Sequence, residues 1–308
     1  MIAKYFSKSK PIHFVIVTAL LFLAFVATKV LFVVEEINIF FVLKQLGIFG
    51  ICFFSLFILD FLVSKNKLTK KNSYQILFFV LFFMLMPQAF LNSNLLLANL
   101  LVLFALRRLV SLRSKKHQKK KILDATIWIS LASLLYFWSV LFFILIIAAL
   151  FLYKISDIKN WFIPIIGILL VAVVSYAALI VLNISLADFF SRFNTSISFD
   201  FSSLNDRSII IGATIFFAYF LWSLFYYLNN LKNKAKSYRT SYILILLTAF
   251  LAFSIVIIAP YKTGSEFIFL LAPLAIIVTN YMELISEKWF KEVLIGILII
   301  APIINLVL

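Results

Sequence analysis

Long apolar runs separated by short polar segments extend over the whole chain. A helix needs about 20 apolar residues, with a range near 17–25, to cross the hydrocarbon core of a bilayer. The pattern therefore predicts an all-α fold, a polytopic bundle of transmembrane helices. The apolar runs that could each form one span lie at about 12–34, 46–63, 74–90, 94–110, 161–183, 208–228, 241–259, 266–282 and 293–308.

The apolar segment 122–153 is longer than the others. As one helix it would extend for about 48 Å at 1.5 Å per residue, which is too long for one ordinary crossing. Lys and Arg collect in cytosolic loops, and placing the basic loops together requires an even number of crossings within this segment. We predict a helical hairpin that turns near Ser133–Ser139, with one long tilted helix as the alternative. The basic loops are 64–73, 107–121 and 229–240.

This map gives about ten spans, in a range of nine to eleven, with a cytosolic N-terminus. The first run follows three lysines and is longer than the apolar region of a signal peptide, which indicates an uncleaved span. No Pro-rich or Ser-rich linker divides the chain, so we expect residues 1–308 to form a single integral membrane domain. The expected location is a bacterial inner (cytoplasmic) membrane.

Composition excludes other classes of protein. Of the residues, 65% are hydrophobic and 13% are charged, whereas soluble domains are about half apolar and a quarter charged. The 28 Lys and Arg against 12 Asp and Glu give a net charge of +16, which fits basic cytosolic loops rather than nucleic acid binding. Cys52, His13 and His117 are too few for a disulfide framework or a His-rich metal site. We expect no metal and no cofactor.

Charged residues on the expected outer face are the candidates for catalysis or ligand binding. Glu35 and Glu36 follow the first span, and either carboxylate could act as a general base on a hydroxyl group, unless the pair is only a solvated helix end. Lys29 lies seven residues before Glu36, so the two share a helix face and a pair or common cavity is possible. The alternative for Lys29 is an ammonium that snorkels to the interface.

Two outer segments carry further candidates. Residues 185–207 contain Asp188 beside several phenylalanines, a pattern that favours a short amphipathic helix at the interface. Arg192 in this segment could clamp a phosphate, because guanidinium offers bidentate donors; an interfacial Arg anchor is the alternative. In the loop 261–266, Lys262 and Glu266 are expected close to the membrane surface, where they could pair with each other.

Three features together resemble GT-C-type membrane glycosyltransferases, which use polyprenyl-phosphate sugars at the outer face. They are the acids after the first span, the hairpin at 122–153 after a basic loop, and the segment 264–275, which is similar to an acid-aromatic-Leu-Leu-x-x-Pro segment of that family. The resemblance implies Glu35 or Glu36 as the catalytic base. The phosphate ligands that it implies are Arg192, Arg207 and Lys262, with Lys29 as a further candidate.

The chain departs from that family by having Glu rather than Asp and no outer domain, so an inactive relative is an alternative. Its Phe-, Lys- and Ile-rich character also resembles uncharacterised multi-pass membrane proteins of Bacteroidota. The competing functions are a non-enzymatic subunit or scaffold of an envelope complex, and a carrier or flippase. The expected partners are membrane lipid, a polyprenyl-phosphate sugar and other membrane proteins.

Overall fold

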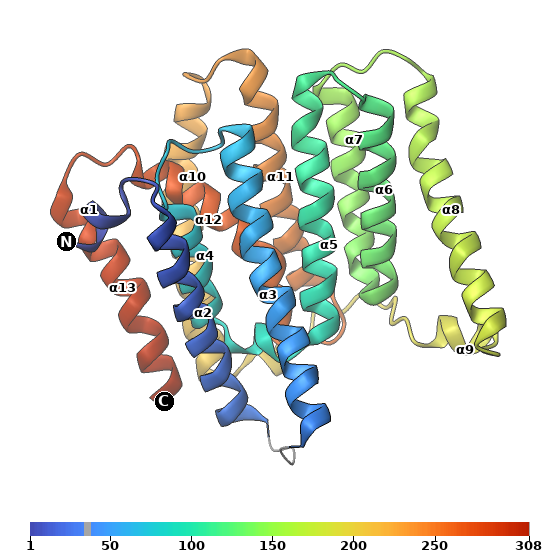
Figure 1. Cartoon of the computed structure of the whole chain (residues 1–308), viewed down its shortest axis with the longest axis horizontal. Helices are drawn as coiled ribbons and strands as arrows, with labels where there is room; N and C mark the ends of the chain where they lie inside the picture. Colours follow the sequence, from blue (N-terminus) through green and yellow to red (C-terminus); the bar gives the residue numbers. More distant parts are fainter. Residues whose placement is uncertain (34–37, 308) are drawn as a thin grey trace.

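The computed structural model describes residues 1–33 and 38–307, and within these ranges the chain is all-α, with no strand. Helices run back and forth between two ends of the molecule (Figure 1). The α-helices are α1 (Ile2–Phe6), α2 (Pro11–Phe32), α3 (Ile39–Asn66), α4 (Tyr74–Leu85), α5 (Ser93–Val110), α6 (Gln118–Leu135), α7 (Phe143–Leu152), α8 (Lys159–Val181), α9 (Leu186–Ser191), α10 (Arg207–Leu231), α11 (Lys236–Ile258), α12 (Ile268–Met282) and α13 (Lys288–Val307).

Seven helical segments among the described residues are long and apolar enough to cross a membrane, which supports a membrane protein. Two further apolar helices are shorter: α4, and the segment Phe137–Leu152 that contains α7. At 1.5 Å per residue, the 12 residues of α4 extend for about 18 Å, less than the roughly 30 Å of a hydrocarbon core. The sequence therefore predicts about ten crossings, whereas seven helical segments among the described residues are long and apolar enough to cross.

The predicted hairpin within 122–153 is confirmed. Helix α6 ends because Tyr136 is extended, with φ −146° and ψ 107°. A 3₁₀ helix, Phe137–Phe142, then reverses the chain into α7, which packs back against α6. One long tilted helix is thereby excluded.

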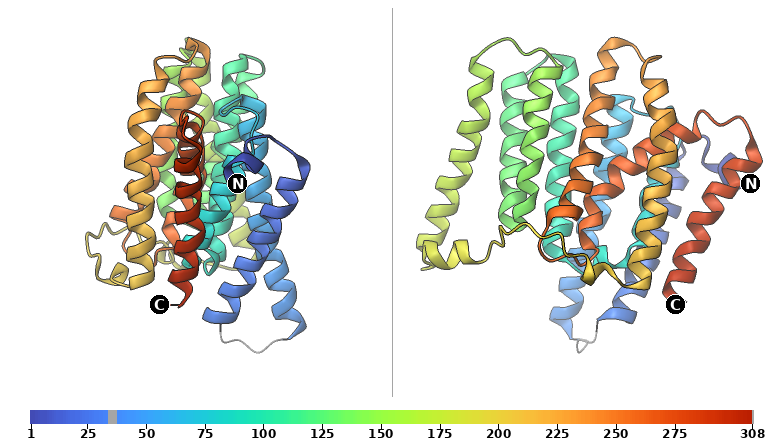
Figure 2. Two further views of the ribbon diagram at one scale, coloured as in Figure 1. Left: turned by 90° about the vertical axis from the view of Figure 1, so that its left-hand side faces the viewer. Right: turned by 180° about the vertical axis from the view of Figure 1, so that it is seen from behind.

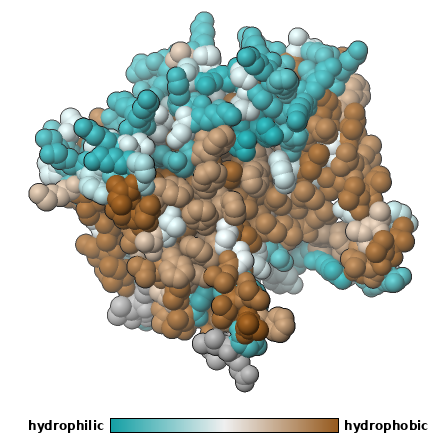
Figure 3. All heavy atoms as spheres, viewed as in Figure 1, coloured by the Kyte–Doolittle hydropathy of each residue, from teal (hydrophilic) through white to brown (hydrophobic). Residues whose placement is uncertain are grey.

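The three basic loops lie at one end of the bundle, where hydrophilic side chains form a continuous cap (Figure 3). Contacts between distant segments join this end: the guanidinium of Arg113 lies 3.9 Å from the ring centre of Tyr238. The carboxylate of Glu283 likewise accepts hydrogen bonds from the backbone N–H of Lys70 and the side chain of Asn72, both at 2.6 Å. We call it the lysine-rich end, defined by residues 67–73, 115–117 and 232–235.

The opposite end is also tied together by contacts between distant segments. Ser265 donates a hydrogen bond to the backbone carbonyl of Gln88 at 2.8 Å, and the amide of Gln88 donates to Ser208 at 3.1 Å. We call this the opposite end, defined by residues 86–92, 136–142, 182–206 and 259–267. Asp188, Arg192, Lys262 and Glu266 belong to it, and Arg207 begins α10 directly beside it.

Helices α4 and α12 form the centre of the bundle. Every residue of α12 is buried, and so is every residue of α4 except Met84. Helix α8 stands at the edge of the bundle with the short helix α9 at its foot (Figure 2). Its main neighbour is α6. Helices α4 and α12 therefore form the buried centre of the bundle, and α8 forms one of its edges.

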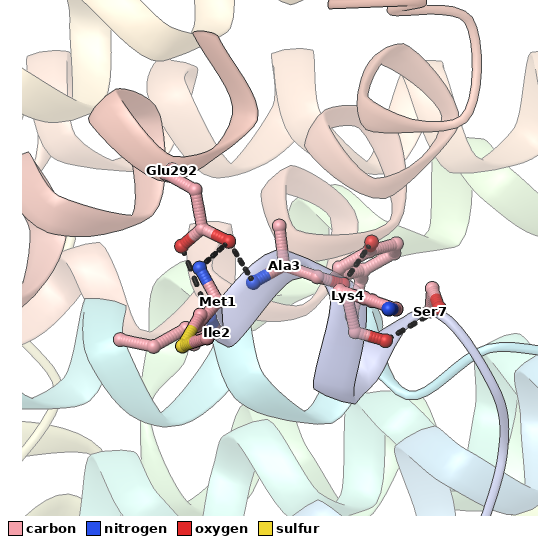
Figure 4. Close-up of polar contacts among 7 residues, drawn as sticks. Met1, Ile2, Ala3, Lys4, Ser7 and Glu292 are labelled. Carbon is pink, nitrogen blue, oxygen red and sulfur yellow. Dashed lines mark hydrogen bonds and ion pairs between the residues drawn. The ribbon is translucent and has the colours of Figure 1, made fainter. Parts of the chain in front are cut away.

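The N-terminal segment closes the other margin. The amino group of Met1 and the backbone N–H groups of Ile2 and Ala3 all bind the carboxylate of Glu292 on α13 (Figure 4). The hydroxyl of Tyr74 donates to the carbonyl of Ala3 at 2.5 Å. These contacts join α1 to the N-terminal part of α13 and to α4.

Candidate functional site

A pocket of about 370 Å³ lies at the opposite end, between the hairpin turn, the segment that follows α9 and the start of the α11–α12 connection. Its lining combines one cation with aromatic and amide side chains, and no carboxylate is among the described residues that line it. The residues that matter for its chemistry are Tyr136, Trp138, Arg192, Asn194 and Tyr261. We call it the Arg192 pocket.

The hairpin turn holds two of these side chains in fixed positions. The ring of Tyr136 stacks on Phe269 of α12, with centroids 5.8 Å apart and planes 25° apart. Phe142, at the other end of the turn, also contacts Phe269, at 5.4 Å. The turn is therefore anchored on the central helix, and it presents Tyr136 and Trp138 to the pocket.

Polar atoms of this turn are buried without partners. The hydroxyl of Tyr136, the indole N–H of Trp138 and the hydroxyl of Ser139 have no hydrogen-bond partner among the described residues. Buried polar atoms are normally hydrogen-bonded, and leaving one unsatisfied costs about 1–3 kcal/mol. Because these atoms are themselves buried, a ligand in the Arg192 pocket would reach them only through a rearrangement of the turn.

Arg192 reaches the pocket from the end of α9. Ser185 caps that helix: its hydroxyl accepts from the backbone N–H of Asp188 at 3.0 Å and donates to the Asp188 carboxylate at 2.6 Å. Phe193 then contacts Phe189 at 5.0 Å, which fixes the chain beyond the helix. Asp188 thus has a capping role, as a short helix at an interface would require.

The Arg192 side chain is exposed, and within the described part of the chain its guanidinium forms no hydrogen bond or ion pair. The same pocket holds no carboxylate that could neutralise it. The guanidinium is therefore available to an external anion. Its planar donors suit the oxygens of a phosphate or carboxylate.

An apolar pocket of about 270 Å³ adjoins the Arg192 pocket between α6 and α8. Leu134 and Phe189 line both pockets, so the two are neighbours rather than separate hollows. Their chemistry differs: the second is lined mainly by aliphatic and aromatic side chains of α6, α8 and α9. Together they place a polar hollow next to an apolar one, as a ligand with a polar head group and an apolar chain requires.

Lys262 is close in sequence to this site, but its ammonium is engaged elsewhere. The side chain is 1% exposed, and it donates to the carbonyls of Ser198 at 2.6 Å and Ala259 at 2.8 Å. The ammonium also lies 4.7 Å from the ring centre of Phe201. Lys262 therefore ties the 182–206 segment to the end of α11.

Glu266 and Lys262 have different partners. The Glu266 carboxylate is buried and accepts from the backbone N–H of Thr263 at 3.1 Å and from the Thr263 hydroxyl at 3.2 Å. Both residues thus support the connection between α11 and α12. In the facing segment, the backbone N–H of Ser202 donates to Asp200, and this hydrogen bond lowers the pKa of Asp200 below its ordinary value.

The remaining candidates are placed apart from Arg192. Arg207 is the first residue of α10, behind the N-cap Asp206, and does not line the Arg192 pocket. Lys29 lies 5.5 Å over the ring of Phe25 and lines a separate pocket of about 330 Å³ between α2 and α3. Glu35 and Glu36 lie outside the described residues. The structure therefore brings one predicted phosphate ligand, Arg192, into a pocket with partners that the sequence did not nominate.

Sequence reasoning missed Tyr136 and Trp138 as site residues. Both fall at the tip of the hairpin, where an interfacial aromatic belt accounts for them equally well. The sequence carries no signal that separates a pocket residue from an interfacial aromatic residue at these two positions. In the described ranges, no three His, Cys, Asp or Glu side chains form a group able to hold a metal ion.

Comparisons with known proteins give a family but no activity. No curated protein and no solved structure matches the chain. One family model, described as a family of unknown function (DUF6427), matches residues 1–307. Because this match covers almost the entire helical bundle, the chain belongs to the family of unknown function DUF6427.

Proposed function

We propose that this protein binds a phosphate-bearing lipid at the opposite end of the bundle, with the phosphate at Arg192 and the chain in the apolar pocket between α6 and α8. The single observation that carries this proposal is that the two pockets adjoin at Leu134 and Phe189. A small polar ligand would use only the first pocket, and an apolar ligand only the second. A lipid phosphate uses both.

The donors at the site favour a phosphate over a neutral head group. Arg192 supplies an exposed guanidinium, and no carboxylate is among the described residues that line its pocket. Hydrogen bonds to charged groups contribute about 1.5–3 kcal/mol each, so an anionic acceptor gains most from this arrangement. Asn194 lines the same pocket, and its side-chain oxygen accepts from the backbone N–H of Ser196 at 3.0 Å and from the Ser196 hydroxyl at 2.6 Å.

The exposed character of α8 supports entry of the lipid from the side. Only 17% of its apolar window is buried within the protein, and the apolar pocket is formed against its inner face. A lipid chain can therefore reach the pocket from the bilayer without passing through the central helices. If the lysine-rich end is cytosolic, as the positive-inside rule implies, the Arg192 pocket faces the outer side of a bacterial inner membrane.

Among phosphate-bearing lipids, we propose a polyprenyl-phosphate-linked sugar as the natural ligand. The corresponding enzymatic proposal is sugar transfer to an acceptor hydroxyl: Glu35 or Glu36 takes the hydroxyl proton, the acceptor oxygen bonds to the anomeric carbon, and polyprenyl phosphate leaves. The alternative is a non-enzymatic subunit or scaffold of an envelope complex. The described pockets support a phosphate-bearing lipid, and the polyprenyl-phosphate sugar is what the resemblance to GT-C-type glycosyltransferases implies. The transfer proposal needs, in addition, a carboxylate that reaches the acceptor hydroxyl.

Binding can be tested with the purified full-length protein and two probes that differ by one group: undecaprenyl phosphate and undecaprenol. Native mass spectrometry counts the bound molecules. Arg192→Gln is expected to weaken phosphate-lipid binding roughly 10- to 100-fold, since about 1.4 kcal/mol corresponds to tenfold, while undecaprenol binding stays unchanged. Arg207→Gln is the matched control, because it removes the same charge at the same end but outside the pocket.

Equal binding of the two probes, or equal losses in the two arginine variants, would contradict the proposal. The transfer step is tested separately with the double variant Glu35→Gln, Glu36→Gln and a radiolabelled polyprenyl-phosphate sugar. Loss of sugar release with unchanged lipid binding supports a transferase. Sugar release that persists in the double variant excludes these two carboxylates as the base.

A further inference from the structure

A further pocket, of about 260 Å³, lies at the lysine-rich end, far from the Arg192 pocket along the helices. It is formed by the end of α3, the end of α5 and the 3₁₀ turn Ser111–Ser114 after it, and the first turn of α6. No Asp or Glu is among the described residues that line it. The cations that line it are Lys65, Arg107, Arg108, Arg113, Lys116 and Lys121.

Several of these cations are held in defined positions rather than spread into solvent. The ammonium of Lys121 donates to the carbonyl of Ser111 at 2.6 Å and to the hydroxyl of Ser114 at 2.7 Å. The guanidinium of Arg107 lies 4.6 Å from the ring centre of Phe61. Flexible surface lysines would separate to reduce their repulsion, whereas these side chains are fixed around one hollow.

Neutralisation within the protein is incomplete. Arg108 pairs with Asp124 at 2.8 Å, and among the described residues this is the one ion pair formed by the cations of this pocket. The neighbouring Arg113 stacks on Tyr238, yet its Nη1 atom is buried without a hydrogen-bond partner. A buried guanidinium N–H without an acceptor is costly, so Arg113 adds an unsatisfied donor to the uncompensated positive charge beside this hollow.

The start of α6 adds a further attraction for an anion. His117, which lines the pocket, precedes the first residue of this 18-residue helix, and no side chain caps its N-terminus. The free backbone N–H groups of a helix N-terminus and the helix dipole both favour negative charge. They act here at the same hollow as the fixed guanidinium groups.

We infer that this pocket is a binding site for an anionic phosphate group. The positive-inside rule accounts for a basic loop, but it does not account for fixed guanidinium groups around a hollow with a buried donor left unpaired. The phosphate can come from the head group of an anionic membrane lipid or from a free phosphate compound. The site is independent of the Arg192 pocket, because it shares no lining residue with it.

The test uses the full-length protein with phosphatidylglycerol, phosphatidylcholine and inorganic pyrophosphate as probes. The double variant Arg107→Gln, Arg113→Gln is compared with Lys119→Gln, Lys120→Gln, which removes the same two charges from exposed positions beside the pocket. We expect the arginine variant to bind phosphatidylglycerol roughly 10- to 30-fold more weakly, and the lysine variant to change less than about twofold. Native mass spectrometry measures lipid retention, and pyrophosphate is added as a competitor.

Displacement of the lipid by pyrophosphate supports a site for free phosphate compounds, and retention supports a lipid head-group site. Arg107→Lys, Arg113→Lys keeps the charges and is expected to restore most of the binding, which guards against a variant that fails to fold. Equal losses in the arginine and lysine double variants would show that net charge alone attracts the lipid. That result, or equal retention of phosphatidylcholine and phosphatidylglycerol, overturns the inference.

Discussion

Helices α8 and α12 show that apolar character and burial are separate properties in this protein. The window in α8 has a mean hydropathy of 2.7 and is 17% buried, whereas the window that contains α12 has a mean hydropathy of 1.6 and is entirely buried. In a soluble protein the order would be reversed, because water drives the most apolar helix inside. The comparison indicates that the surroundings of α8 are themselves apolar.

The physical reason lies in what each environment can satisfy. Lipid offers no hydrogen bonds, so a helix that carries polar side chains is more stable when those groups find partners inside the bundle. Asn280 of α12 does so: its amide donates to the carbonyls of Leu68 at 3.0 Å and Ile276 at 2.9 Å. Beyond its first turn, α8 carries only Ser175 and Tyr176 as polar side chains, so most of this helix can face lipid at little cost.

The largest expected difference between the two helices is in the effect of truncating a leucine. Leu271 of α12 is 0% exposed and Leu170 of α8 is 45% exposed. Leu271→Ala leaves a cavity and is expected to lower the free energy of unfolding by about 2–5 kcal/mol. Leu170→Ala is expected to change it by less than about 0.5 kcal/mol. Unfolding titrations in mixed micelles measure both; equal losses would mean that α8 is covered by a partner or by tighter packing.

A smaller difference is expected from glycines that control how helices approach each other. A Cβ at Gly167 of α8 would lie 2.7 Å from Cγ2 of Thr126 on α6, whereas a Cβ at Gly50 of α3 would meet nothing within 4 Å. Gly167→Ala is expected to cost about 1–3 kcal/mol through this clash, and Gly50→Ala to gain about 0.5–1 kcal/mol of helix stability.

The same pair of variants tests whether α8 contributes to ligand binding. Displacing α8 from α6 should enlarge the apolar pocket and weaken undecaprenyl phosphate binding in Gly167→Ala but not in Gly50→Ala. Native mass spectrometry provides the measurement. Unchanged binding in Gly167→Ala would remove α8 from the proposed lipid site, although its stability effect could still stand.

The smallest expected effect concerns the polar end of α12, which has no counterpart in the apolar α8 segment. Burial raises the pKa of Glu283, while the hydrogen bonds from Lys70 and Asn72 partly oppose this shift. Because the pKa is higher in the folded state, the folded protein binds this proton more tightly than the unfolded chain does. The resulting stabilisation is fully present below the unfolded-state pKa, and it is lost as pH rises through the folded-state pKa.

Acidification from neutral pH toward the ordinary glutamate pKa of about 4.3 should therefore remove a small destabilisation, of less than about 1 kcal/mol. Glu283→Gln cannot titrate at this position and should give a flatter profile of unfolding free energy against pH. The two profiles, measured in the same micelles, provide the check. A wild-type profile that falls more steeply than the variant's on acidification would reverse the assigned sign.

The candidate site was only partly predictable. Arg192 could be nominated because a guanidinium in an outer segment is not explained by topology. The engagement of Lys262 by two carbonyls could not be predicted, since Ser198 lies 64 residues away and the contact depends on how the 182–206 segment folds. Tyr136 and Trp138 carry no signal that separates a pocket from an interfacial belt until Arg192 is placed beside them.

The sequence by itself determined the helical membrane character, the hairpin at 122–153 and the gathering of the basic loops at one end. The helical membrane character follows from local hydropathy, and the hairpin and the shared end of the basic loops follow from the positive-inside rule applied to the loops along the chain. Only the tertiary structure decided that α4 and α12 are central and that α8 lies at the edge of the bundle. It also decided which polar groups meet in the Arg192 pocket and in the pocket at the lysine-rich end. Helices that are apolar on all sides carry no periodic pattern to indicate their neighbours, so packing between distant segments makes that choice.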